Sequence, residues 1–145
     1  MDLWELGVRE QVRDTLARYT HAGDSGRIDE LARCFVPDGV LEVKGLPPAR
    51  GRDAILALLS PSAGADGDGA VLAHRFVRHN LSSIRIVAVE PDRVETAAYF
   101  LVATADGPDH WGRYRDVLVP FHGDWLFAHR RVTVDAKAPG SYLTG

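Results

Sequence analysis

The six histidines are the residues of this sequence best suited to catalysis, because an imidazole titrates near pH ~6.5 and exchanges protons at neutral pH. None has an acid or a cysteine at a spacing typical of metal ligands, and His74 and His79 do not share a face of either a helix or a strand. The sequence also has no nucleophile elbow, phosphate-binding loop, dinucleotide fingerprint or H-E-x-x-H motif. We therefore expect neither a metal nor a cofactor, which leaves proton transfer between side chains.

The composition is that of one ordinary globular domain. The chain has 145 residues, of which 46% are hydrophobic and 26% charged, and such a chain can bury a core without disulfides. Its one cysteine, Cys34, cannot form an internal disulfide, and we expect a buried, inert thiol. We assign residues 1–145 to a single domain.

Charge and hydropathy argue against two classes of partner. The net charge is −3, and no segment rich in lysine and arginine suggests binding to nucleic acid. No apolar run approaches the ~20 residues that cross a bilayer, and the N-terminus has no basic region followed by an apolar run. We therefore predict a cytoplasmic protein without a nucleic-acid or membrane partner.

Apolar spacing predicts helices in the first half of the chain. Val8, Val12, Leu16 and Tyr19 recur at intervals that place them on one face of a helix. Further helices are predicted over residues 28–35 and 52–60, with a short strand over residues 40–44 between them. The glycine-rich residues 61–69 are predicted to form a surface loop.

The second half of the chain predicts strands. Four segments rich in β-branched and aromatic residues, separated by turn residues, lie at residues 76–89, 94–104, 111–121 and 125–134. Helices followed by antiparallel strands indicate an α+β fold. A long sheet that curls around helices packed on one face encloses a conical pocket, and we expect the functional site there.

Several short motifs lie at residues 19–24, 29–39, 78–80, 112–116, 123–125 and 130–131. They resemble those of SnoaL-like proteins, which belong to the nuclear-transport-factor-2-like superfamily. The resemblance implies N-terminal helices packed on a highly curved antiparallel sheet. It implies less about activity, because this fold hosts dehydratases, isomerases, polyketide cyclases, dehydrohalogenases and non-catalytic subunits.

The resemblance also implies roles for three residues. In the scytalone dehydratase, bile-acid dehydratase and dehydrochlorinase branches, an aspartate after the first helix orients a histidine base on the first long strand; these positions match Asp24 and His79. Tyr19 matches the tyrosine that bile-acid dehydratases place before that aspartate. The carboxylate fixes the tautomer of the histidine and stabilises the imidazolium, and the tyrosine hydroxyl can hold or protonate a substrate oxygen.

One departure from the dehydratase pattern lies on the next strand. The dehydratases carry a further acidic or histidine group there, whereas residues 100–104 of this chain are apolar except for Thr104. The resemblance therefore implies an Asp–His dyad and not the complete dehydratase set.

Each of the three residues also has a structural interpretation. Asp24 precedes a turn and a helix, which is typical of an N-cap. His79 fits a hydrogen-bonded core histidine, and Tyr19 continues the apolar stripe of its helix. Asp106, Asp109 and His110 lie in a predicted turn and are expected to be solvated; the alternative is that His110 reaches the pocket mouth.

Strand alternation selects residues that could position a substrate. Tyr114 shares a face of its strand with Asp116, and the two either line the cavity or belong to an oligomer surface. Arg131 is predicted on the same face as the aromatic residues of the last strand, in or near the pocket, whereas Arg130 is predicted to face away. The candidates for substrate binding are Tyr114, Asn80 and Arg131.

These inferences predict a cofactor-independent lyase or isomerase acting on a small, mostly apolar molecule that bears a carbonyl or hydroxyl group. His79 is expected to remove a proton from carbon, with Asp24 orienting it and Tyr19 contacting the substrate oxygen. The alternative is a non-catalytic ligand-binding or assembly module, a role that the same fold fills as the small subunit of ring-hydroxylating dioxygenases. In both cases an open curved sheet predicts a homodimer or homotrimer.

Overall fold

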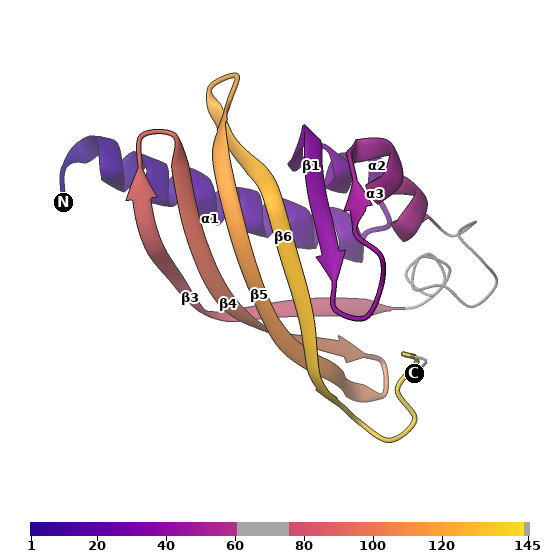
Figure 1. Cartoon of the computed structure of the whole chain (residues 1–145). Coiled ribbons are helices and arrows are strands. Elements are labelled where there is room, and N and C mark those ends of the chain that lie inside the picture. Colours follow the sequence, from indigo (N-terminus) through magenta and orange to yellow (C-terminus); the bar gives the residue numbers. More distant parts are fainter. Residues whose placement is uncertain (61–75, 144–145) are drawn as a thin grey trace.

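The computed structural model describes residues 1–60 and 76–143, so the surface loop predicted over residues 61–69 lies outside the described residues. Helices cover one face of a curved sheet that does not close into a barrel (Figure 1). The α+β class and the order of helices before strands are confirmed. Within the described ranges, no helix combines the length and the apolar character needed to span a membrane.

The long N-terminal helix α1 (Leu3–Asp24) crosses the sheet. Asp2 caps it, because its carboxylate accepts the backbone N–H of Glu5 at 2.8 Å. The predicted apolar stripe of α1 is buried. Two shorter helices follow, α2 (Ile28–Ala32) and α3 (Arg52–Leu59), and α2 ends earlier than predicted because Phe35 begins a strand.

Six strands form the sheet in the order β2-β1-β6-β5-β4-β3. Their bounds are β1 (Phe35–Val43), β2 (Ala49–Arg50), β3 (Val77–Glu90), β4 (Arg93–Thr104), β5 (Gly107–Phe121) and β6 (Asp124–Lys137). Neighbouring strands are antiparallel except β1 and β6, which are parallel. The four long strands are confirmed, whereas β1 is longer than predicted and β2 is too short to show a pattern.

The core lies between α1 and the side of the sheet that we call the inner face, which carries Leu118 and Phe127. The Phe35 and Phe127 rings lie 5.3 Å apart, and the edge of Tyr19 meets both. Burying each such side chain contributes ~1.5–3 kcal/mol to folding. Cys34 is buried here as predicted, and burial raises the pKa of its thiol and so favours the unreactive protonated form.

An extra residue interrupts the pairing of β6. Leu118 on β5 pairs with Phe127, but the preceding Val117 pairs with His129, which leaves Ala128 without a partner. A bulge of this kind reverses which residues of a strand point to each face, because side chains otherwise alternate with a period of two.

The bulge exchanges the positions predicted for two arginines. Arg130 is fully buried on the inner face, beside Tyr19 and Tyr114, while Arg131 is exposed on the opposite, outer face. The prediction that Arg131 faces the pocket and Arg130 faces away is wrong, since simple alternation along the strand does not include the bulge.

Candidate active site

The structure brings Asp24 and His79 together, although they are 55 positions apart in the sequence. Nδ1 of His79 lies 2.6 Å from Oδ1 of Asp24, and Oδ2 accepts the backbone N–H of His79 at 3.0 Å. The side chain of His79 is 19% exposed and that of Asp24 is 9% exposed. The carboxylate thus fixes both the ring and the main chain of the histidine, and it favours the neutral tautomer in which Nδ1 carries the proton.

The ends of two elements produce this contact. Asp24 is the last residue of α1, and Gly26 adopts a positive φ of 73° that turns the chain toward α2. The N-cap position of α2 is Arg27, so the N-cap interpretation of Asp24 is wrong. His79 is the third residue of β3, where the alternation of the strand turns it toward the helices.

His79 lines a cavity of about 110 Å³ between α1 and the inner face. A cavity of roughly 150 Å³ holds benzene, so this smaller one has room for at most one small ring. Its polar and aromatic lining includes Tyr19, Thr20, His79, Phe100, His110, Tyr114 and Tyr142. The rest of the lining is mainly aliphatic.

The two predicted tyrosines lie on one side of this cavity, around a buried cation. The guanidinium carbon of Arg130 is 4.3 Å from the centre of the Tyr19 ring and 3.8 Å from that of Tyr114. Burial raises the pKa of both tyrosines, although the charge of Arg130 acts in the opposite direction. Both phenols therefore stay protonated at neutral pH and can donate a hydrogen bond.

Arg130 itself is held by Asp116. Nε and Nη2 donate to the two carboxylate oxygens at 2.8 and 2.9 Å, and both side chains are 0% exposed. Burial alone lowers the pKa of an arginine, but the Asp116 carboxylate holds the pKa of Arg130 above its ordinary value. Thr96 Oγ1 donates to the same carboxylate at 3.2 Å. Tyr114 and Asp116 thus share the inner face. Tyr114 lines the cavity, as the first of the two predicted options has it, whereas Asp116 does not and instead binds Arg130.

A second histidine that lines the cavity, His110, is also paired with a carboxylate. Nδ1 of His110 lies 2.9 Å from Oδ2 of Asp109, and both side chains are 8% exposed. Ser141 Oγ donates to Oδ2 at 2.6 Å, and the Tyr142 N–H to Oδ1 at 3.3 Å. Burial alone raises the pKa of a carboxyl group, but the hydrogen bonds from Ser141, His110 and Tyr142 hold the pKa of Asp109 below its usual range.

The expectation that Asp109 and His110 are solvated is wrong, and the alternative that His110 reaches the pocket is correct. They belong to β5, which begins at Gly107, and the segment at residues 138–143 folds back over Asp109. Alternation along β5 was the available signal. It places His110 on the same face as Tyr114 and Asp116, and the structure buries all three.

Sequence reasoning also missed Thr20, which lines the cavity beside His79. Its hydroxyl oxygen is buried and has no hydrogen-bond partner among the residues that the structure describes. A buried polar atom is normally hydrogen-bonded, so this hydroxyl is an exception among the described side chains.

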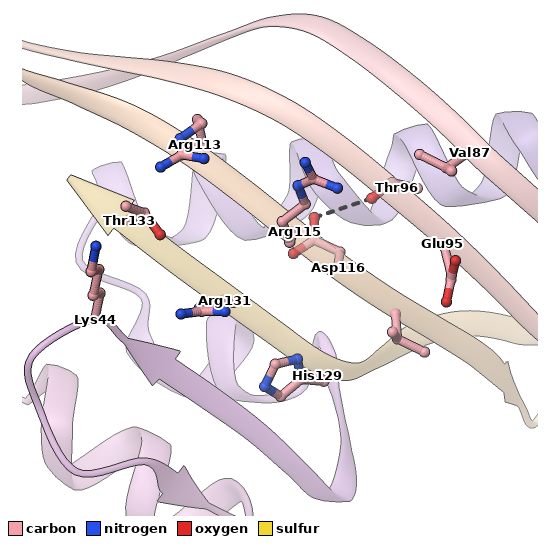
Figure 2. Close-up of a pocket in the computed structure, with 11 residues that line it drawn as sticks. Lys44, Val87, Glu95, Thr96, Arg113, Arg115, Asp116, His129, Arg131 and Thr133 are labelled. Carbon is pink, nitrogen blue, oxygen red and sulfur yellow. Dashed lines mark hydrogen bonds between the residues drawn. The ribbon is translucent and has the colours of Figure 1, made fainter. Parts of the chain in front are cut away.

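The other two predicted substrate contacts do not line the cavity. Asn80 follows His79 on β3 and is exposed; its side chain donates to the backbone of Leu101 at 3.4 Å. Arg131 lines a groove of about 540 Å³ on the outer face (Figure 2). These placements correct the prediction that either residue contacts a substrate in the cavity.

The outer groove is larger than the cavity but less suited to chemistry. Apart from the buried Asp116, its charged groups are at least partly exposed, and some are neutralised: Arg113 pairs with Asp135 at 3.0 Å and His129 with Glu42 at 2.9 Å. Exposed ion pairs of this kind perturb neighbouring groups little. Across the described ranges, no group of histidine, cysteine and acidic residues is arranged to hold a metal. Because the Asp24–His79 pair is largely shielded from water and His79 lines the inner cavity, we place the site in that smaller cavity.

The family model for the SnoaL-like domain matches residues 4–131. The chain belongs to the SnoaL-like family. No curated protein matches it. The resemblance read from the short motifs is thereby confirmed for the family and for the fold.

Solved structures agree with this membership. The SnoaL-like chain is similar to an NTF2-like protein with a cystatin-like fold from Novosphingobium aromaticivorans, with 26% identity, a TM-score of 0.79 and coverage of 99% of this chain and 93% of the other. A Catenulispora acidiphila protein in complex with S-DNPA has 31% identity, a TM-score of 0.72 and coverage of 90% and 95%. A candidate scytalone dehydratase from N. aromaticivorans has 21% identity, a TM-score of 0.76 and coverage of 92% and 88%, and this likeness concerns the fold alone.

Proposed function

We propose that this SnoaL-like protein is a cofactor-independent lyase or isomerase acting on a small, mostly apolar molecule that carries a carbonyl or hydroxyl group. The observation that carries the proposal is the Asp24–His79 contact of 2.6 Å at the wall of an apolar cavity. A histidine whose Nδ1–H is bound by a carboxylate presents Nε2 as a proton acceptor.

In the proposed reaction, Nε2 of His79 removes a proton from a carbon of the substrate. Asp24 stabilises the imidazolium that forms, and the contact is strengthened because both groups are shielded from water. General base catalysis of this kind typically accelerates a reaction by ~10²–10⁴-fold.

Tyr19 and Tyr114 are proposed to act on the substrate oxygen. Both line the cavity, and burial keeps their hydroxyls protonated, so each can donate to an oxygen that gains negative charge. The size of the cavity limits the enclosed part of a substrate to at most one small ring.

The assembly-module alternative predicts a filled cavity with Asp24 and His79 apart. The hydrogen-bonded pair and the open cavity instead favour the enzyme. We therefore propose the acid–base reaction and keep the module as an outcome of the test.

Two single-ring probes that give one product test the proposal. 3-Cyclohexenone reaches the conjugated 2-cyclohexenone by a double-bond shift, and 3-hydroxycyclohexanone reaches it by loss of water. We expect the protein to accelerate at least one of these reactions, measured by the ultraviolet absorbance of the conjugated enone. His79→Gln and Asp24→Asn are each expected to lower that rate by ~10²-fold or more.

The matched control is Arg78→Gln, because Arg78 neighbours His79 on β3 and is exposed on the outer face. It should keep the wild-type rate, and all three variants should keep the thermal unfolding midpoint within a few degrees. Wild-type rates in both site variants, or no acceleration of either probe by the wild-type protein, would contradict the proposed function and favour the assembly module.

A further inference from the structure

The outer groove contains two arginines that directly oppose each other. Arg115 on β5 and Arg131 on β6 are cross-strand partners, both line the groove and both are exposed. Directly paired residues point to the same face with their Cβ atoms ~5 Å apart, and like charges in this arrangement destabilise a sheet. The chain therefore holds two guanidinium groups side by side at a cost to folding.

The carboxylates near this pair are bound by other groups. Glu42 is the neighbour of Arg131 on β1, but its carboxylate pairs with His129 at 2.9 Å. Among the residues that the structure describes, no carboxylate forms an ion pair with Arg115 or Arg131. The two acidic residues of the groove lining pair with arginines outside it, namely Glu95 with Arg93 and Asp116 with Arg130.

Two further cations extend the cluster, as Figure 2 shows. Arg113 lies two residues before Arg115 on the same face of β5. Lys44 directly follows β1, and its backbone N–H donates to Val132 on β6 at 2.9 Å. The chain as a whole has a net charge of −3, so the groove is a positive region on an acidic protein. A concave surface of one sign concentrates its field on a ligand of the opposite sign.

A phosphate group matches two neighbouring guanidinium groups better than a carboxylate does. A carboxylate has two oxygens, which a single guanidinium binds through a pair of parallel hydrogen bonds. A phosphate monoester has three acceptor oxygens and a charge of about −1.5 to −2 at pH 7, enough for two guanidinium groups at once. With a rise of ~3.3 Å per residue, Arg113 lies roughly 7 Å along the strand from Arg115, which is within side-chain reach of a second phosphate.

We propose that the outer groove binds a small organic molecule that carries two or more linked phosphate groups, with the Arg115–Arg131 pair on one phosphate and the neighbouring cations on the next. The groove of about 540 Å³ lies within the range of ~300–1,000 Å³ that is typical of small-ligand sites. Val87 lies at the end of the groove away from Lys44 and offers apolar contact to the rest of the molecule.

The inference goes beyond the proposed function and does not rest on it. The groove and the inner cavity lie on opposite faces of the sheet, and their linings share no residue. His79→Gln is therefore expected to bind a phosphate ligand as the wild type does, so failure of the proposed reaction leaves this proposal intact.

Inorganic tripolyphosphate is the probe, titrated into the protein at low ionic strength and followed by isothermal titration calorimetry. We expect one site per chain. Arg115→Gln and Arg131→Gln should each weaken binding by ~10-fold or more, because each removes charge-assisted hydrogen bonds to the same phosphate. Citrate, which carries three carboxylates, should bind at least ~10-fold more weakly than tripolyphosphate.

The matched control is Arg78→Gln, which removes the same charge from an exposed position of the outer face that does not line the groove. It should change the affinity by less than ~2-fold, because salt screens distant charges. Asp135→Asn acts in the opposite direction, since it releases Arg113 from its ion pair, and should tighten binding by about 2-fold or more. This variant keeps the test decisive if an arginine variant fails to fold.

Three results would overturn the proposal. Equal weakening in Arg78→Gln and in the two groove variants would mean a general attraction of anions to the protein. Equal affinity for citrate or for a hexaglutamate peptide would exclude phosphate as the class of ligand. No binding of tripolyphosphate, together with a dimer in sedimentation that Arg115→Gln dissociates, would assign the groove to a contact between two copies of the chain.

Discussion

The same residue types differ in burial and in partners between the two faces of the sheet. Arg130 and Arg131 are adjacent, yet Arg130 is fully buried against Asp116 and two tyrosines, whereas Arg131 is exposed in an open groove. Histidines show the same contrast: His79 and His110 are largely buried against carboxylates, while His129 on the outer face is 37% exposed beside Glu42.

This contrast shows that the burial of the titratable groups, more than the volume of the pocket, distinguishes a site suited to proton transfer from a charged surface. The outer groove is about 540 Å³ and the inner cavity about 110 Å³. Water screens the charges of the groove, but in the cavity a carboxylate acts on an imidazole through a medium of lower polarity. The smaller space therefore holds the groups whose interactions are strong enough to direct proton transfer.

The largest effect that tests this contrast is on stability. Arg130→Met leaves the Asp116 carboxylate buried without its partner, and we expect the free energy of unfolding to fall by ~3–5 kcal/mol. Arg131→Met removes an exposed charge and should change it by less than ~0.5 kcal/mol. Urea denaturation followed by circular dichroism measures both. Equal losses in the two variants would show that the faces do not differ as described.

A smaller effect concerns pH. The folded pKa of Asp109 is lowered, so its contribution to stability is complete above the unfolded pKa of ~3.9 and is lost as the pH falls through the folded value. We therefore expect Asp109→Asn to be less stable than wild type at about pH 6 and the gap to narrow at about pH 3. Urea midpoints at the two pH values provide the measurement.

The outer-face control for this prediction is Asp135→Asn. Asp135 is 43% exposed and pairs with Arg113, so its removal should cost little at either pH. A gap between wild type and Asp109→Asn that stays constant with pH would mean that the carboxylate is not held ionised by its neighbours.

The spacing of apolar and β-branched residues predicted the regular helices and strands of the fold. The stripe from Val8 to Tyr19 predicted α1, and runs of β-branched residues predicted β3, β4, β5 and β6. The bulge at Ala128 has no such signal, because one extra residue appears only when β6 is paired with β5. That single residue exchanged the predicted positions of Arg130 and Arg131.

The contacts of the site were less accessible from the sequence. Asp24 and His79 were paired only through the family resemblance, since nothing in local spacing joins residues 55 positions apart. The burial of Asp109 and His110 was not expected from the sequence, because the residues that contact Asp109, Ser141 and Tyr142, are more than 30 positions further along the chain. The predicted homodimer or homotrimer stays a prediction, to be checked by analytical ultracentrifugation.

The most direct test of the account is the tautomer of His79. Nitrogen-15 NMR of labelled histidine side chains distinguishes a ring protonated at Nδ1 from one protonated at Nε2, and the His79→Gln variant assigns the signals. We expect neutral His79 to carry its proton on Nδ1, facing Asp24, and to present a bare Nε2 to the cavity. A neutral ring protonated mainly at Nε2 would contradict the claim that His79 is a base oriented by Asp24.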